Sequence, residues 1–247
     1  MRIERNGPVA LLRMENGKAN AISASLLERL DGMISQLADA RAAVITGQGS
    51  AFSAGLDLPA LADLDRQTMR GFIDRFSAVV LRIFELPIPL VAAVNGHAVA
   101  GGCVLALQAD VRIGADRDAR IGLNETQLGI GLPVAVVETL RWQVPGSSLA
   151  PLALEGRLVS PREALNLGLL HELVPEADLL PRALQRANAL AALPPAGLRM
   201  VKESLRKPAA AAARANQDAE AERWLDTWFS PDSQQRLKET VARLKKS

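Results

Sequence analysis

Short apolar runs alternate with segments of helical periodicity along the first two-thirds of the chain. Each run is five or six residues long and rich in alanine, valine, isoleucine and leucine, which is typical of buried strands. These runs predict strands at residues 9–14, 42–46, 90–94, 111–115 and 169–174. Apolar residues that recur every three or four positions predict helices at residues 23–37, 61–86, 103–109, 134–142 and 179–193. The alternation predicts α/β layering.

The last third of the chain is predicted to be almost wholly helical. Pro194-Pro195 and Pro208 bracket one helix, because proline lacks the N–H that a helix interior needs. Two more helices are predicted at residues 209–228 and 231–246. There is no tandem repeat and no low-complexity linker. We therefore expect two regions, an α/β core over residues 1–193 and a helical region over residues 194–247.

Two glycine-rich segments follow predicted strands and leave backbone groups open to a ligand. Gly101-Gly102 enters a helix, so the first helical N–H groups lack intrahelical acceptors and favour an anion or a developing oxyanion. No lysine or threonine follows the pair as in a phosphate-binding loop, which indicates an uncharged oxygen such as a carbonyl. Tight strand–helix packing explains the pair equally well. The segment at residues 47–58 either presents a backbone N–H at Ala54-Gly55 or is an ordinary loop.

Composition argues against several classes of function. The 247-residue chain is 49% hydrophobic, carries a formal net charge of +2 and has 3% aromatic residues, which argues against nucleic-acid binding. One cysteine, Cys103, and two histidines without metal-ligand spacing argue against a disulfide framework and a metal site. No apolar stretch reaches the roughly 18 residues of a membrane span, and the first residues lack the order of a signal peptide. We therefore expect a cytoplasmic protein.

Three glycine-containing segments stand in a fixed order: GQGSAFSAGLDL, PLVAAVNGHAVAGGCVLALQADVRIGA and IGLNETQLGIGLP. In this order and spacing they resemble the crotonase superfamily, the enoyl-CoA hydratases and isomerases. The resemblance covers nearly the whole chain, and IGLNETQLGI with the preceding AGGC is most similar to the mitochondrial-type Δ3-Δ2-enoyl-CoA isomerases. It implies an α/β fold, a crotonase-like spiral of ββα units followed by a helical C-terminal region that packs trimers.

The resemblance also implies roles for individual residues. The backbone N–H groups of Ala54 and Gly101 match the two donors that bind a thioester oxygen, and Glu125 matches a catalytic glutamate. Six residues match segments that line the CoA site: Lys18, Ala19, Ala21, Gly55, Leu56 and Asp57. The implied partners are an acyl-CoA substrate and further copies of the chain in a homotrimer or hexamer. Coenzyme A is then part of the substrate, and no separate cofactor and no metal are implied.

One position departs from the pattern of the hydratases. They typically carry a second catalytic glutamate in a Gly-Gly-Gly-Cys-Glu segment, where this chain has Val104. Hydration needs a positioned water and usually two carboxylates, whereas moving a double bond needs one base that takes a proton from C2 and returns it at C4. The sequence therefore predicts a Δ3-Δ2-enoyl-CoA isomerase of fatty-acid metabolism. Glu125 is its single proton shuttle, with a pKa raised by an apolar pocket.

Two alternatives stay open. The protein is either an enoyl-CoA hydratase, a lyase that works with Glu125 alone, or a catalytically divergent acyl-CoA-binding member of the superfamily. Without the resemblance, Glu125 is explained as well by a helix end or an exposed surface. Trp224 and Trp228 either pack the helical tail over an acyl pocket, of the same or a neighbouring chain, or belong to the core. Lys245 and Lys246 are better explained as a solvated tail than as ligands of a CoA phosphate.

Overall fold

Two β-sheets organise the protein, and the computed structural model describes residues 1–17 and 19–245. The larger sheet has six strands in the order β1-β2-β3-β5-β7-β10, and the smaller has four in the order β4-β6-β8-β9. The strands of the larger sheet are β1 (Arg2–Asn6), β2 (Val9–Met14), β3 (Ala42–Gly47), β5 (Leu90–Val94), β7 (Val111–Ala115) and β10 (Glu172–Val174). Those of the smaller sheet are β4 (Ala51–Ser53), β6 (His97–Val99), β8 (Ile121–Gly122) and β9 (Leu158–Val159).

From β3 to β8, consecutive strands go alternately to the two sheets. Strands β3, β5 and β7 pair in parallel in the larger sheet, and β4, β6 and β8, which follow each of them, pair in parallel in the smaller one. A helical segment after each pair of strands returns the chain to the next position in both sheets. This is the spiral of ββα units that was expected.

The helices end close to where the apolar periodicity predicts. They are α1 (Ala24–Ser35), α2 (Leu58–Leu61), α3 (Arg66–Phe84), α4 (Gly101–Leu107), α5 (Val134–Gln143), α6 (Pro161–Asn166), α7 (Leu179–Ala191), α8 (Pro195–Trp228) and α9 (Pro231–Leu244). Shorter turns are the 3-10 helices η1 (Glu125–Leu128), η2 (Gly146–Ser148) and η4 (Glu176–Asp178) and the π-helix η3 (Ala150–Leu154). Ser23 and Ser160 cap α1 and α6 by accepting the amide hydrogens of Leu26 and Glu163.

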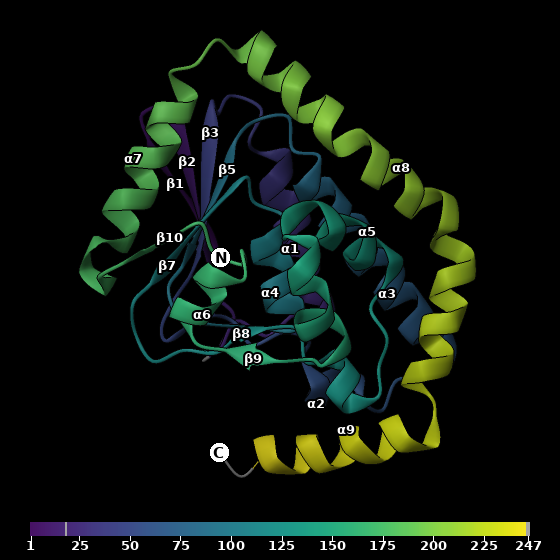
Figure 1. Ribbon diagram of the computed structural model, residues 1–247. Helices are drawn as coiled ribbons and strands as arrows, with labels where there is room; N and C mark the ends of the chain where they lie inside the picture. Colours follow the sequence, from purple (N-terminus) through teal and green to yellow (C-terminus); the bar gives the residue numbers. More distant parts are fainter. Residues whose placement is uncertain (18, 246–247) are drawn as a thin grey trace.

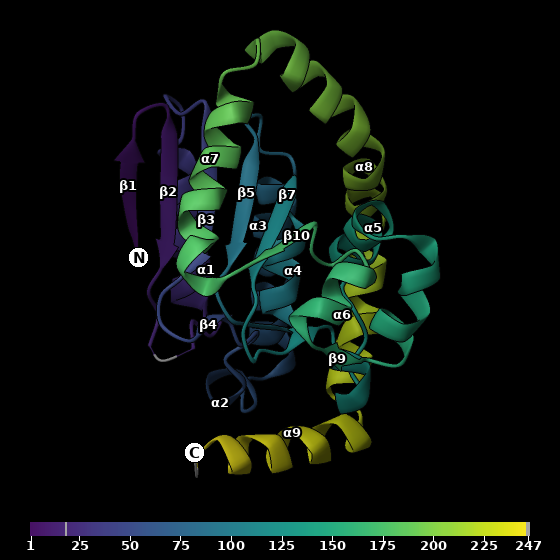
Figure 2. The same cartoon turned by 60° about the vertical axis from the view of Figure 1, so that its left-hand side comes forward.

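The central strands β2, β3 and β5 of the larger sheet are buried, and α7 lies over one face of that sheet (Figure 2). Along β2, Val9 and Leu11 belong to the cluster under α7, whereas Ala10 and Leu12 belong to the main core with α1, α3 and α4. This alternation follows from the two-residue period of a strand. Helix α7 meets its cluster through buried side chains one turn apart, such as Ala183 and Ala187.

Two predicted helices are wrong in extent. The predicted helix over residues 61–86 is interrupted, because Asp65 accepts the amide hydrogen of Thr68 at 2.8 Å and starts α3 afresh. Pro208 does not separate two helices, since α8 runs through it from Pro195 to Trp228. Proline removes one backbone hydrogen bond there. Two residues earlier, Arg206 anchors this part of α8 to the core by donating to the Gln108 carbonyl at 2.9 Å and to Asp110 at 2.6 Å.

The C-terminal helices wrap around the rest of the molecule (Figure 1). Helix α8 curves along one side, and α9 turns back below the core to contact α2 and η1. Buried residues of both helices, such as Trp228 and Leu237, belong to the same hydrophobic core as the strands. The region boundary at residue 193 stays a prediction. No helix in the described part of the chain is long and apolar enough to cross a membrane.

Candidate active site

The glycine-rich segments, the Glu125 turn and the C-terminal helices meet around one cavity of about 530 Å³. Its walls come from the segment after β4, the start of α4, η1 and the facing sides of α3, α8 and α9. Ala19, Ala21, Leu56, Asp57 and Gly101 all line it. The structure thus brings residues from both ends of the chain to one place. Lys18 lies outside the described residues.

The Ala54 amide is not available as an oxyanion donor, so that prediction is corrected. Its N–H group donates to the Ala19 carbonyl at 2.9 Å. Ala54 still lines the cavity, but its only backbone donor is used by the chain itself. This bond ties the Ala19–Ala21 segment to the segment that follows β4.

The Leu56 amide, two residues further along the chain, is free to act as a hydrogen-bond donor where the Ala54 amide is not. Ile22 pairs with Leu56 in a single parallel bridge, with its N–H bonded to the Gly55 carbonyl at 2.7 Å and its carbonyl bonded to the Asp57 N–H at 3.0 Å. In a parallel ladder this pattern leaves the N–H of the middle residue unpaired. Within residues 1–17 and 19–245, the Leu56 N–H has no partner, and Leu56 lines the cavity. The parallel bridge is a tertiary contact, which the sequence did not indicate.

The second free N–H belongs to Gly101, as predicted. Gly101 is the first residue of α4, and no acceptor in the described chain pairs with its amide. Ala100 precedes it with φ 51°, a left-handed conformation that is costly for alanine. The Ala100 amide donates to the Gly122 carbonyl at 2.8 Å, which helps to hold this turn. The strained backbone conformation is therefore at Ala100, the residue that sets the direction of the Gly101 amide.

Gly55 joins the two free amides. Its φ is 86°, and a Cβ atom at this position would lie 2.7 Å from the Val99 carbonyl oxygen and 3.3 Å from the Gly101 nitrogen. Only glycine permits both the backbone conformation and this close approach. Gly55 itself is not part of the cavity wall. Its role is therefore to let the Leu56 and Gly101 segments approach each other.

Glu125 is the first residue of η1 and lies on the cavity wall. The residue is half-buried, but its Oε2 atom is enclosed and has no hydrogen-bond partner. Burial raises the pKa of this carboxyl from its ordinary 4.5 to about 7. A carboxyl group with such a pKa is ionised to a large extent near neutral pH and is a stronger base than a solvated one.

Position 104, where the hydratases carry their second glutamate, holds an apolar residue, and the other carboxylates among the described lining residues are Asp57 and Glu239 of α9. Val104 is 1% exposed and lines the cavity with its apolar side chain. Asp57 caps α2 by accepting the Ala60 amide hydrogen at 3.3 Å. Asp110 lies elsewhere, bonded to Lys202 and Arg206, and orders the loop before β5 through the Leu90 amide. The neighbouring Cys103 thiol is fully buried, and burial raises its pKa to about 12, which argues against a thiolate.

The C-terminal helices close the cavity of their own chain. Trp224 and Trp228 stack with ring centroids 5.3 Å apart and line the cavity, and the Trp224 indole donates to the Gly131 carbonyl at 2.9 Å. Helix α9 adds Arg236, Glu239, Thr240, Arg243 and Leu244. Sequence analysis missed these α9 residues, although their spacing of three and four marks one face of a helix. Lys245 does not line the cavity, and Lys246 lies outside the described residues.

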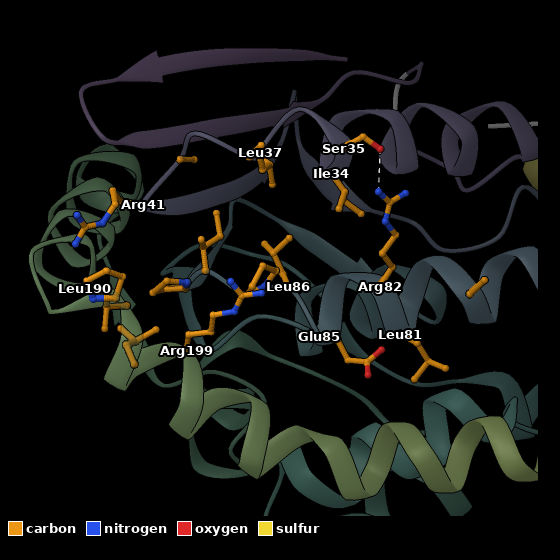
Figure 3. A pocket seen from close by; sticks show the side chains of 18 of the residues that line it. Ile34, Ser35, Leu37, Arg41, Leu81, Arg82, Glu85, Leu86, Leu190 and Arg199 are labelled. Atoms are coloured by element: carbon orange, nitrogen blue, oxygen red, sulfur yellow. Dashed lines mark hydrogen bonds between the residues drawn. The ribbon is translucent and has the colours of Figure 1, made fainter.

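A larger cavity of about 830 Å³ lies beneath the connection between α7 and α8 (Figure 3). Its arginines are paired within the chain: Arg82 with Asp31 and Ser35, Arg199 with Glu203, and Arg214 with Glu85. None of the acidic groups that line it has the enclosed, unpartnered oxygen of Glu125. The smaller cavity is therefore the candidate site. No group of three or more His, Cys, Asp and Glu residues in the described chain is arranged to hold a metal ion.

Comparison with known proteins shows the family of the chain. Residues 4–245 match the model of the enoyl-CoA hydratase/isomerase family. The chain is 33% identical to human mitochondrial enoyl-CoA delta isomerase 1 over 244 residues, 96% of this chain and 80% of that protein. It is 42% identical to a putative enoyl-CoA hydratase of Thermus thermophilus over 188 residues, 73% and 72% of the two chains. The crystal structure of human mitochondrial Δ3-Δ2-enoyl-CoA isomerase superposes with a TM-score of 0.94 at 30% identity, covering 99% of this chain and 98% of that chain.

Proposed function

Because the chain belongs to the enoyl-CoA hydratase/isomerase family, we propose that it moves the double bond of a 3-enoyl-CoA to the trans-2 position. One observation carries the proposal: the cavity holds one carboxyl group of raised pKa, Glu125, and an apolar Val104 beside it. This pair suits proton transfer within a substrate better than addition of water. The substrate brings its own coenzyme A, and the proposed reaction uses no separate cofactor.

The reaction starts with the thioester oxygen at the free amides of Leu56 and Gly101. Ionised Glu125 removes a proton from C2, the C2–H bond breaks, and its electron pair is delocalised into a dienolate with charge on the thioester oxygen. The two N–H groups stabilise that charge, and each donor of this kind contributes about 3–4 kcal/mol in comparable sites. The dienolate then takes the proton back from Glu125 at C4, which restores the carboxylate.

An assay with two substrates tests this proposal. The pure protein is incubated separately with 3-hexenoyl-CoA and with crotonyl-CoA, and the products are separated by chromatography. We expect 2-hexenoyl-CoA from the first and little 3-hydroxybutyryl-CoA from the second. The Glu125→Gln variant should lose isomerisation by about 10²–10⁴-fold, because the amide cannot accept the proton. Fast hydration without a double-bond shift would overturn the proposal.

The second candidate is an enoyl-CoA hydratase. It is favoured by the 42% identity to the putative hydratase of Thermus thermophilus. In that case Glu125 would act on a water molecule, and crotonyl-CoA would be consumed at least as fast as 3-hexenoyl-CoA. A third outcome, no turnover of either substrate although acyl-CoA binds, would indicate a divergent acyl-CoA-binding protein.

Further copies of the chain are the proposed partners. Helix α8 exposes large apolar side chains near the exposed Trp142: Met200 is 69% exposed, Val201 58% and Leu205 55%. Apolar side chains gathered in this way mark an interaction surface. A homotrimer, or a hexamer built from two, would cover them. Light scattering should then give three or six times the 26.4 kDa of one chain, and Val201→Glu should shift the particle toward the monomer. The cytoplasmic location stays a prediction.

A further inference from the structure

Asn124 and Glu125, two consecutive residues at the start of η1, carry buried oxygens without partners. Five enclosed side-chain nitrogen and oxygen atoms in the described part of the chain have no hydrogen bond, and three of them belong to residues that line the candidate site. They are Asn124 Oδ1, Glu125 Oε2 and Trp228 Nε1. An unsatisfied buried polar atom costs about 1–3 kcal/mol, so their concentration at one cavity indicates a function.

The Asn124 side chain does not cap η1, although Asn124 stands at the N-cap position. It is the N-cap residue of η1, where an asparagine side chain ordinarily accepts a backbone N–H of the first turn. Its side chain makes no such bond, and the Gln127 amide donates instead to the Asn124 backbone carbonyl at 3.2 Å. The Asn124 carbonyl oxygen is left in an enclosed place on the same wall as Glu125.

The surrounding chain holds this turn in place. Gly156 packs against it so closely that a Cβ atom there would lie 2.6 Å from Thr126 Oγ1 and 3.4 Å from the Asn124 Cα. At the other end of η1, Ser233 of α9 donates to the Gly129 carbonyl at 2.8 Å. Asn124 and Glu125 are therefore fixed from two sides, which limits relaxation of their side chains toward water.

We propose that Asn124 is a positioning residue that acts through Glu125: its side-chain carbonyl offers no hydrogen bond to the ionised carboxylate and accepts one from the protonated carboxyl group. Two acceptors cannot bond each other, but a proton on Glu125 makes Oε2 a donor and satisfies both orphan oxygens at once. The inference rests on the proposed function, in which Glu125 carries a proton between its removal from C2 and its return to C4. Asn124 then stabilises the protonated form of Glu125, and the ionised form of Glu125 is correspondingly more basic.

The proton balance requires no further reactant. The proton that leaves C2 resides on Glu125, and the same proton is given to C4. The terminal bond of the glutamate has broad two-fold preferences, so its rotation exchanges the two carboxyl oxygens and would let the proton pass between Asn124 and the substrate. Other titratable groups along the cavity are Cys103 near Glu125, Asp57 after β4, and Arg236, Glu239 and Arg243 of α9. The test leaves all of them unchanged.

Direct titration of Glu125 tests the proposal. Protein labelled with 13C at the glutamate carboxyls is titrated by NMR, and the Glu125 signal is identified by its absence in Glu125→Gln. In Asn124→Leu, which keeps the size but removes the acceptor, the Glu125 pKa should fall by about 0.5 or more, and isomerisation should slow about tenfold. In Asn124→Asp, which adds a negative charge, the pKa should rise. The control is Thr126→Val on the exposed side of the same turn, and it should leave the pKa unchanged.

Opposite shifts in the Leu and Asp variants would not arise from a merely structural effect. A pKa that stays constant or rises in Asn124→Leu overturns the inference, since Asn124 would then be neutral or a donor to the carboxylate. The outcome is separable from the proposed function. If 3-hexenoyl-CoA is isomerised but the Glu125 pKa is unchanged by substitution of Asn124, this inference alone fails. If the titration responds as expected but no isomerisation occurs, the proposed function fails while the coupling of the two residues stands.

Discussion

Gly55 and Gly101 approach so closely that a Cβ atom on Gly55 would lie 3.3 Å from the Gly101 amide nitrogen. The two residues belong to different ββα units of the spiral, since Gly55 follows β4 and Gly101 follows β6. Parallel pairing of β4 with β6 brings the ends of these strands together. The proposed oxyanion site thus depends on a contact between two repeats of the fold, and neither repeat could form it alone.

Gly55→Ala should abolish most activity. The added methyl group meets the Val99 carbonyl, and the φ of 86° is unfavourable for alanine, so the Leu56 and Gly101 amides must move apart. Displacement of oxyanion donors should lower kcat by about 10²–10³-fold, measured with 3-hexenoyl-CoA. The matched control is Gly32→Ala, because Gly32 lies within α1 with nothing within 4 Å of its added Cβ. Unchanged kcat in a folded Gly55→Ala variant would contradict the assigned geometry.

The pH dependence of kcat/KM should report the ionisation of Glu125. The base must be deprotonated to accept a proton, and burial raises its pKa to about 7. Activity should therefore rise by about tenfold per pH unit below that pKa and level off above it. An ordinary carboxyl would give a plateau already at pH 6. Initial rates between pH 5 and 9 distinguish the two.

The same pKa predicts how stability depends on pH. Because the folded pKa, about 7, lies above the ordinary 4.5, the folded state holds a proton that the unfolded state has lost between these values. The free energy of unfolding should therefore fall as pH rises through this window, by up to about 3 kcal/mol. Glu125→Gln removes this loss, so its stability relative to the parent protein should be greater at pH 8 than at pH 5. Urea denaturation at one fixed protein concentration measures it.

Val104→Glu should introduce hydration. The substitution places a carboxyl group at position 104, where the hydratases carry their second glutamate, so that with Glu125 a water molecule could be held and deprotonated. We expect crotonyl-CoA hydration to rise at least about tenfold, with Val104→Gln as the control of equal size without a carboxylate. A folded Val104→Glu protein that does not hydrate crotonyl-CoA would show that position 104 does not decide between the two reactions.

Asp110→Asn should destabilise the fold without touching the site. Asp110 is the shared carboxylate partner of Lys202 and Arg206, whose side chains are only 8% and 10% exposed. Loss of its charge leaves two buried cations without an anion, at a cost of about 3–5 kcal/mol. Breaking the exposed Arg199–Glu203 pair by Glu203→Gln should cost less than about 0.5 kcal/mol. Denaturant midpoints of the two variants make the comparison.

The elements of the protein could be predicted from local patterns. The apolar runs located most strands of the larger sheet, and the helical periodicity located α1 and α7, because these signals lie within a short stretch of consecutive residues. The short strands β4, β6, β8 and β9 were not predicted, since two or three residues carry no usable period. Helix α8 was divided in two because the anchoring of Arg206 to the Gln108 carbonyl cannot be read from the residues around Pro208.

The sequence indicated which segments form the candidate site, but not which individual backbone N–H groups are free in it. The resemblance pointed to Glu125, Gly101 and the stretch around residues 54–57. It assigned the first oxyanion donor to Ala54, whose amide is bonded to Ala19, because the choice between neighbouring amides depends on which of them the Ile22 bridge leaves free. The α9 wall could not be placed, since the return of the chain below the core is set by tertiary contacts with α2 and η1.

The stacked Trp224 and Trp228, together with α9, have a consequence for the order in which the protein matures on the ribosome. The oxyanion amides and Glu125 are all synthesised within the first 125 residues, but the wall that encloses them comes from residues 224–244. A nascent chain therefore carries its reactive groups in open water for about a hundred residues of synthesis, at 5–20 residues per second in general. The wall of the proposed active site is therefore complete only when the final helices have been synthesised.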